Sequence, residues 1–159
     1  MGEIVLAAKI THVPTLIMSE QPGRLFGKRQ QAIDGHKDIA RRAKALGADT
    51  IVILDTHWCV NGGYHINANH HFEGVFTSSE FNRQVDLHVL KLWQESEMPT
   101  FIKMLPDYAK KCSGEGEMHD TVMLLGALGW DNYNAKCEVI GEYFPSSGTG
   151  QVNVVFPVQ

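Results

Sequence analysis

The chain has 159 residues, of which 43% are hydrophobic and 20% are charged, a composition typical of one folded domain with a hydrophobic core. The net charge of −4 speaks against a nucleic-acid surface, and no stretch approaches the roughly 18 apolar residues that a membrane span needs. The three cysteines are far apart and form no C-x-x-C pair, so we expect free thiols and a cytoplasmic protein.

The first third of the chain is predicted to form a strand, a helix and a second strand. Residues 3–8 are typical of a short apolar strand, and residues 15–30, with their proline and two glycines, of a loop. Residues 32–46 carry apolar side chains on one side and basic ones on the other before Gly47, which indicates an amphipathic helix. Residues 50–54 (TIVIL) are typical of a strand buried on both faces. This order predicts a β-α-β unit with a right-handed crossover.

The second half is predicted to form three helices followed by two strands. The helices are expected over residues 81–94, 100–111 and 119–128, and the last is apolar almost all round, which predicts a buried helix. The strands are expected over residues 137–140 and 152–156, on either side of a Gly/Ser turn. Together the elements predict an α/β fold in which helices flank a central mixed sheet.

Two histidines follow the predicted strands of the first third. His12 lies in ITHVP after the first strand, and His57 lies in LDTHW after the second. Ligands of open parallel sheets bind beyond the carboxyl ends of the strands, so neighbouring strands would bring both imidazoles to one edge. Two interpretations stay open for the pair: ligands of a shared metal ion, or hydrogen-bonded histidines of surface loops.

An acidic segment before the helix expected at residue 119 offers a third ligand. Its sequence GEGEMHD contains Glu115, Glu117 and Asp120. Two histidines and one carboxylate leave three coordination positions open, which suits Fe(II) that must hold both an organic chelator and O2. The competing interpretation is that these acidic residues cap free N–H groups and favour the dipole at the start of the helix.

Six segments of the chain resemble one known enzyme family: AAKITHVP, AIDGHKDI, DTIVILDTHW, YHINANHHFEGVFTS, GEGEMHDTVMLLGALGW and SSGTGQVNVVFP. They resemble the class III extradiol ring-cleavage dioxygenases, in particular those that act on 3,4-dihydroxyphenylacetate. That family uses Fe(II), bound by two histidines and a carboxylate, to insert both atoms of O2 beside the hydroxyls of a catechol. The resemblance runs through nearly the whole chain. Because the sequence shows no internal repeat, low-complexity tract or linker, we expect a single domain over residues 1–159.

The resemblance also implies a ligand set and partners. His12 and His57 correspond to the two metal-binding histidines, and Asp120 to the carboxylate, with Glu117 and Glu115 as alternatives. The implied cofactor is Fe(II), and the implied partners are a catecholic small molecule and O2, without nucleic acid or membrane.

The similarity to the family passes at residues 79–81 directly from the N-terminal part of the family sequence to its C-terminal part. Residues 1–80 resemble the N-terminal part of the family and residues 81–159 its C-terminal part, which implies a shortened version of the family fold. The absent middle holds strands and helices of the central sheet and the histidine that serves the family as acid/base. His119, or one of His65, His70 and His71, is the candidate for that role in this chain. Uncovered strand edges and apolar faces predict a homo-oligomer.

Three functions therefore stay open. The first is Fe(II)-dependent extradiol cleavage of a catechol such as 3,4-dihydroxyphenylacetate by O2. The second is a shortened relative that binds metal or catechol with little or no catalysis. The third is a metal-dependent hydrolase on the same ligands, which would act with zinc and ignore O2.

Overall fold

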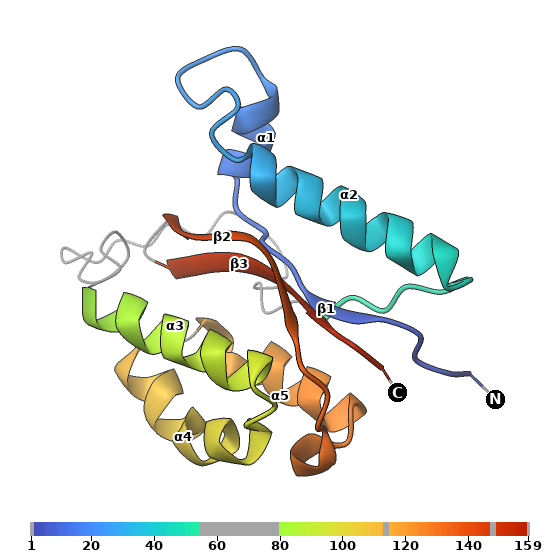
Figure 1. Ribbon diagram of the computed structural model, residues 1–159. Helices are drawn as coiled ribbons and strands as arrows, with labels where there is room; N and C mark the ends of the chain where they lie inside the picture. Colours follow the sequence, from blue (N-terminus) through green and yellow to red (C-terminus); the bar gives the residue numbers. More distant parts are fainter. Residues whose placement is uncertain (1, 55–79, 113–114, 147–148, 159) are drawn as a thin grey trace, which may run out of the picture.

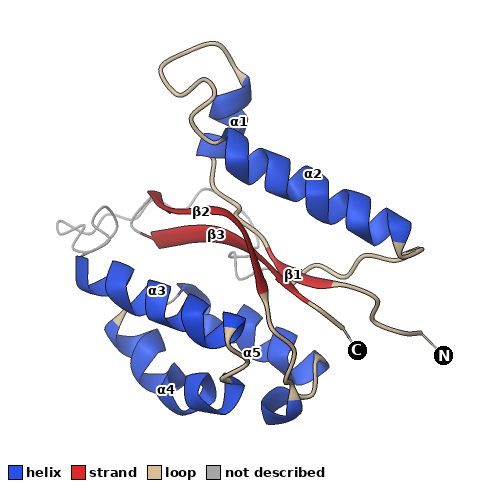
Figure 2. Cartoon of the chain, in the orientation of Figure 1, coloured by secondary structure: helices blue, strands red, loops and turns tan. Residues whose placement is uncertain are grey.

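The computed structural model describes residues 2–54, 80–112, 115–146 and 149–158. A three-stranded antiparallel sheet lies between two groups of helices (Figure 1; Figure 2). Its strands are β1 (Ala7–Lys9), β2 (Glu138–Ser146) and β3 (Thr149–Phe156), in the order β1-β3-β2. The sheet therefore joins the first and last strands of the chain.

The middle strand, β3, organises the sheet. It pairs with β1 through Ala7 opposite Phe156, and with β2 through Ser146 opposite Thr149. The second half of β3 is buried at every residue from Asn153 to Phe156, as expected for a strand with neighbours on both edges and helices over both faces. The β2–β3 register shifts between Ile140 and Phe144, which bends the hairpin.

Helices α1 (Thr15–Glu20) and α2 (Gln30–Ala45) lie on one side of the sheet (Figure 1). The apolar side of α2 meets β2 and β3, and it buries Ala32, Ile33 and Gly35. Gly35 lets the helix approach closely, because a Cβ at this position would collide with the side chain of Asn153 on β3.

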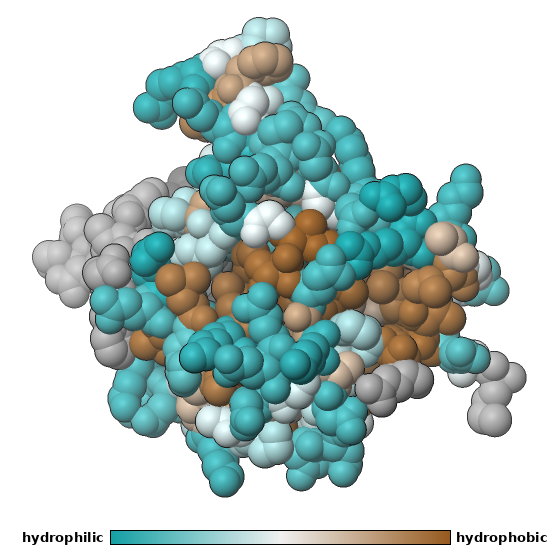
Figure 3. Space-filling view, viewed as in Figure 1, coloured by the Kyte–Doolittle hydropathy of each residue, from teal (hydrophilic) through white to brown (hydrophobic). Residues whose placement is uncertain are grey.

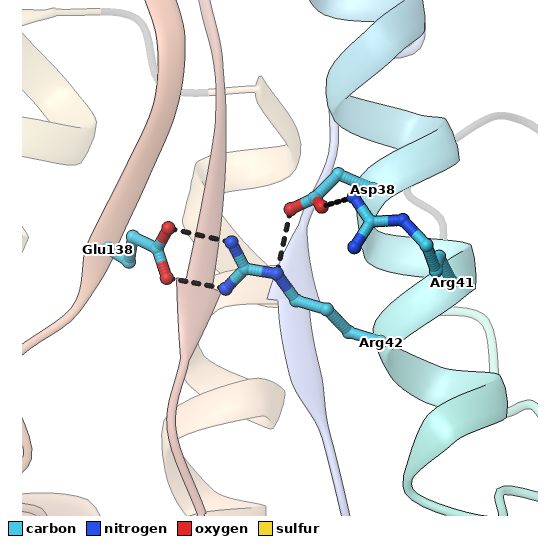
Figure 4. A network of polar contacts seen from close by, with 4 residues as sticks. All are labelled: Asp38, Arg41, Arg42 and Glu138. Atoms are coloured by element: carbon cyan, nitrogen blue, oxygen red, sulfur yellow. Dashed lines mark hydrogen bonds and ion pairs between the residues drawn. The ribbon is translucent and has the colours of Figure 1, made fainter.

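A polar network connects the outer side of α2 to β2 (Figure 4). Arg42 Nη2 donates to Glu138 Oε1 at 2.7 Å, and Arg42 Nε lies 2.7 Å from Asp38 Oδ2. The other oxygen of Asp38, Oδ1, pairs with Arg41. The hydrogen bond from Arg42 lowers the pKa of the Glu138 carboxyl. These side chains are partly exposed, and such pairs contribute only about 0–1 kcal/mol each, so apolar packing holds α2 on the sheet.

The opposite side of the sheet carries the remaining helices: α3 (Glu80–Gln94), α4 (Met98–Lys111), α5 (His119–Ala127) and the short 3-10 segments η1 (Glu115–Met118) and η2 (Trp130–Asn132). Their buried side chains form the main hydrophobic core together with β3. Trp93 lies at its centre, with ring centroids 5.1 Å from Phe101 and 5.2 Å from Phe156. These aromatic contacts join α3, α4 and β3.

The helix predictions for residues 32–46, 81–94, 100–111 and 119–128 are confirmed to within two residues at each end. The two strands expected near the C-terminus are also confirmed, but β2 continues to Ser146 and β3 already begins at Thr149. The free thiols of Cys112 and Cys137 are confirmed as well. None of the helices in the described residues is long and apolar enough to cross a membrane.

Two predictions about helical structure were wrong. Residues 15–30 are not all loop, because α1 occupies their first six positions. Helix α5 is not buried all round: Thr121 and Leu125 face the core, while Val122 and Met123 are 37% and 46% exposed. An almost uniformly apolar helix presents no polar side, so its sequence could not show which side would meet the core.

The predicted β-α-β unit is not formed by the described residues. Residues 50–54 form no strand, and Ile51, Val52 and Ile53 are 82%, 80% and 80% exposed. A strand buried on both faces needs hydrogen-bonded neighbours and covering helices, and the described part of the chain provides neither at this segment. Strand β1 instead pairs antiparallel with β3.

Candidate functional site

The buried side-chain amide of Asn153 holds the backbone just before His12. The Thr11 N–H donates to Asn153 Oδ1 at 2.9 Å, and Asn153 Nδ2 donates to the carbonyl oxygen of Ala32 at 3.0 Å. Thr11 and Asn153 are each only 1% exposed. The segment that carries His12 is thereby tied both to β3 and to α2.

A cavity of about 160 Å³ lies beside this segment. His12 and Lys9 line it from the end of β1, and Asp120 lines it from the first turn of α5. The remaining wall is mixed, with apolar Val89 and Trp93 beside polar residues such as Asp86. Residues more than 100 positions apart in the sequence thus meet at one hollow.

A larger hollow of about 370 Å³ lies between the N-terminal segment and the end of α5. Its only acidic side chain is Glu3, and none of the predicted ligands in the described residues lines it. We therefore place the candidate site at the smaller cavity.

Both oxygens of the Asp120 carboxylate have hydrogen-bond partners. Its Oδ1 accepts hydrogen bonds from the Thr121 N–H at 2.8 Å and from Thr121 Oγ1 at 3.4 Å, both from the next residue of α5. Its Oδ2 lies 3.0 Å from Lys9 Nζ, which also donates to Thr121 Oγ1. One oxygen of Asp120 therefore supports the helix, while the other binds a cation, here the ammonium group of Lys9.

The alternative carboxylates are placed differently. Helix α5 begins only at His119, and Glu117 and Met118 before it have φ of 52° and 66°, so Glu117 and Asp120 do not share a helical face. Glu117 and His119 are exposed, and neither lines the cavity. The side chain of Glu115 lies outside the described residues.

The structure thus brings two of the predicted ligands, His12 and Asp120, to one cavity. His57 lies in residues 55–79, outside the described part of the chain. Within the described ranges, no group of three histidine, cysteine or acidic side chains is close enough to hold a metal. The imidazole of His12 and the cation-binding oxygen of Asp120 nevertheless fit the nitrogen and oxygen donors that Fe(II) takes.

A carboxylate that the sequence analysis did not identify lies on the same wall. Asp86 of α3 accepts hydrogen bonds from Tyr108 Oη and Tyr143 Oη, each at 2.7 Å, and all three residues line the cavity. Burial, together with the charge of Asp86, raises the pKa of both tyrosines, and the same two causes raise the pKa of the Cys112 thiol. The tyrosines are therefore neutral donors at physiological pH.

The sequence does contain a signal for Asp86. It precedes Val89, Leu90 and Trp93 at the spacing of one helical face, and all three are buried. An acidic residue in line with a buried face requires partners, because an unpaired charge there is costly.

Two stretches of the chain, residues 6–81 and 67–157, match the family described as the catalytic LigB subunit of aromatic ring-opening dioxygenase. The chain belongs to this family. It is also similar to 3,4-dihydroxyphenylacetate 2,3-dioxygenase of Escherichia coli, with 32% identity over 259 aligned residues that cover 86% of this chain and 94% of the relative. The class III extradiol resemblance seen in the sequence is confirmed.

The alignment with this relative is longer than the chain itself. Its 259 positions exceed the 159 residues of this chain by 100, so at least 100 aligned positions of the relative have no counterpart here. The two family matches overlap at residues 67–81, which includes the predicted jump at residues 79–81.

Proposed function

We propose that the protein binds Fe(II) through His12, His57 and Asp120 and uses O2 to cleave the ring of a catechol such as 3,4-dihydroxyphenylacetate. Membership of the ring-opening dioxygenase family supports the reaction class. The single observation that carries the site is that His12 and Asp120 line one cavity although they lie far apart in the sequence.

The residues around the cavity have distinct roles in this proposal. His12 offers a nitrogen donor from a segment that Asn153 holds in place, and Asp120 offers a carboxylate oxygen from the first turn of α5. Bound Fe(II) would supply open coordination positions and a path for electrons from the ring to O2. Val89 and Trp93 provide an apolar wall that suits an aromatic ring and keeps water away.

The cavity volume limits the size of the ligand. Sites for drug-sized molecules commonly measure about 300–1,000 Å³. The cavity beside His12 measures about 160 Å³, which suits a ligand with a single ring. This agrees with a simple catechol as the substrate.

A second function is metal or catechol binding with little or no catalysis. It is favoured because the described residues bring no second histidine to the cavity for proton transfer. Within the described residues, His12 is the only histidine that lines the cavity, and His119 lies outside the cavity lining. A positioned acid/base commonly contributes about 10²–10⁴ in rate, so a protein without one would bind its ligands and turn over slowly.

Oxygen uptake separates these functions. The protein, loaded anaerobically with Fe(II), is mixed with 3,4-dihydroxyphenylacetate in air, and O2 consumption and the yellow ring-cleavage product are followed. Ring cleavage predicts coupled O2 uptake that is lost in His12→Ala and kept in His88→Ala, a matched change of an exposed histidine on α3. Metal retention without O2 uptake would support binding alone, and activity with zinc in the absence of O2 would support a hydrolase.

A further inference from the structure

Lys9 forms an ion pair with Asp120 Oδ2, the oxygen that would bind a metal. Asp120 Oδ1 is engaged by the backbone of its own helix, which leaves Oδ2 as the atom directed toward a cation. Lys9 Nζ lies 3.0 Å from that atom. Both side chains line the cavity beside His12, so the ammonium group lies within the candidate metal site.

The contact is built into the fold. Lys9 is the last residue of β1, where its backbone pairs with Val154 of β3, and its ammonium also donates to Thr121 Oγ1. Thr121 is completely buried. The side chains of Lys9 and Asp120 are 25% and 33% exposed, so water screens the pair less than it would screen two fully exposed side chains.

We propose that Lys9 is an internal competitor of the metal: its ammonium group neutralises Asp120 in the metal-free protein and has to move away when a divalent cation binds. This inference rests on the proposed function, because it takes Asp120 as a metal ligand. A partly buried carboxylate without a counter-charge is costly, so the metal-free protein gains stability from Lys9. A monovalent and a divalent cation repel each other at one carboxylate oxygen, so the same lysine weakens metal binding.

Calorimetric titration of the whole chain with Mn(II) tests the proposal. Lys9→Met keeps the apolar stem and removes the charge, and we expect it to bind Mn(II) at least about tenfold more tightly than the unchanged protein, a difference that corresponds to about 1.4 kcal/mol. The matched control Lys103→Gln, an exposed lysine on α4, should leave the affinity unchanged. Asp120→Asn should lose binding whether or not Lys9 is present.

A second measurement uses the unchanged protein and does not depend on the folding of a variant. Acylation of lysine amines, read by mass spectrometry, should increase at Lys9 when Mn(II) is added, because the metal releases its ammonium from Asp120, while acylation of Lys103 stays constant. Unchanged Mn(II) affinity in Lys9→Met, or unchanged labelling of Lys9 in protein that binds Mn(II), would overturn the proposal and leave the proposed function standing. Absence of Mn(II) binding in both the unchanged protein and Lys9→Met would instead overturn the proposed metal site, and this inference with it.

Discussion

One buried amide connects three parts of the protein that are far apart in sequence. Asn153 on β3 accepts a hydrogen bond from Thr11, beside His12, and donates one to Ala32 on α2. The approach of α2 is possible because position 35 is a glycine. The position of the candidate ligand His12 therefore depends on a residue that does not itself line the cavity.

Replacement of this amide tests its role in stability. Asn153→Leu leaves the buried Thr11 N–H and the Ala32 carbonyl without their partners, and we expect the free energy of unfolding in urea to fall by about 2–4 kcal/mol. Asn132→Ala, at an exposed asparagine of η2, should change it by less than about 0.5 kcal/mol. Equal effects of the two variants would contradict the role assigned to Asn153.

At the scale of elements, Asp86 holds α3, α4 and β2 together. Tyr108 comes from α4 and Tyr143 from β2, and both donate to the one carboxylate of α3. Burial and the charge of Asp86 raise the pKa of both phenols above the ordinary value of 10.0. The folded state therefore keeps these protons at a pH where the unfolded chain begins to lose them.

This network predicts a loss of stability in alkali. The contribution of the raised tyrosine pKa values is fully present below pH 10.0, the ordinary value for an unfolded chain, and is lost as the pH rises above it. Urea unfolding at a series of alkaline pH values should show the free energy of unfolding falling above about pH 10, and falling less steeply in Tyr108→Phe. The same slope in Tyr108→Phe and the unchanged protein would contradict the assignment.

In the molecule as a whole, the described residues expose apolar side chains to solvent. Figure 3 shows apolar surface between α2 and α3 and on the side where the two chain ends lie. Exposed apolar side chains include Ile51, Val52 and Ile53. Contiguous exposure of this kind is typical of a surface that associates with another chain.

We therefore expect a homo-oligomer at micromolar concentration, measured as molar mass by light scattering. Val52→Lys should lower that mass, because a charge on an associating apolar segment disfavours its burial. Leu46→Lys, at an exposed leucine just after α2, serves as the matched control and should leave the mass unchanged. A monomeric unchanged protein would show that the exposed segment does not drive association.

Structure that depends on neighbouring residues could be predicted from the sequence, whereas structure that depends on residues far apart in the chain could not. The helix over residues 32–46 follows from local periodicity, and the structure confirms it. The same kind of local evidence predicted a buried strand at residues 50–54, and this was wrong because a strand requires distant partners. His12 and Asp120, which the resemblance pairs as ligands, line one cavity. The ion pair of Lys9 with Asp120 links residues 111 positions apart and had no local signal.

The most direct test of the central claim is anomalous scattering at the iron edge from crystals soaked anaerobically in Fe(II). We expect one strong peak in the cavity between the His12 imidazole and Asp120 Oδ2, with the Lys9 ammonium moved away from the carboxylate. Absence of a peak there, with the ion pair of Lys9 and Asp120 intact, would contradict it.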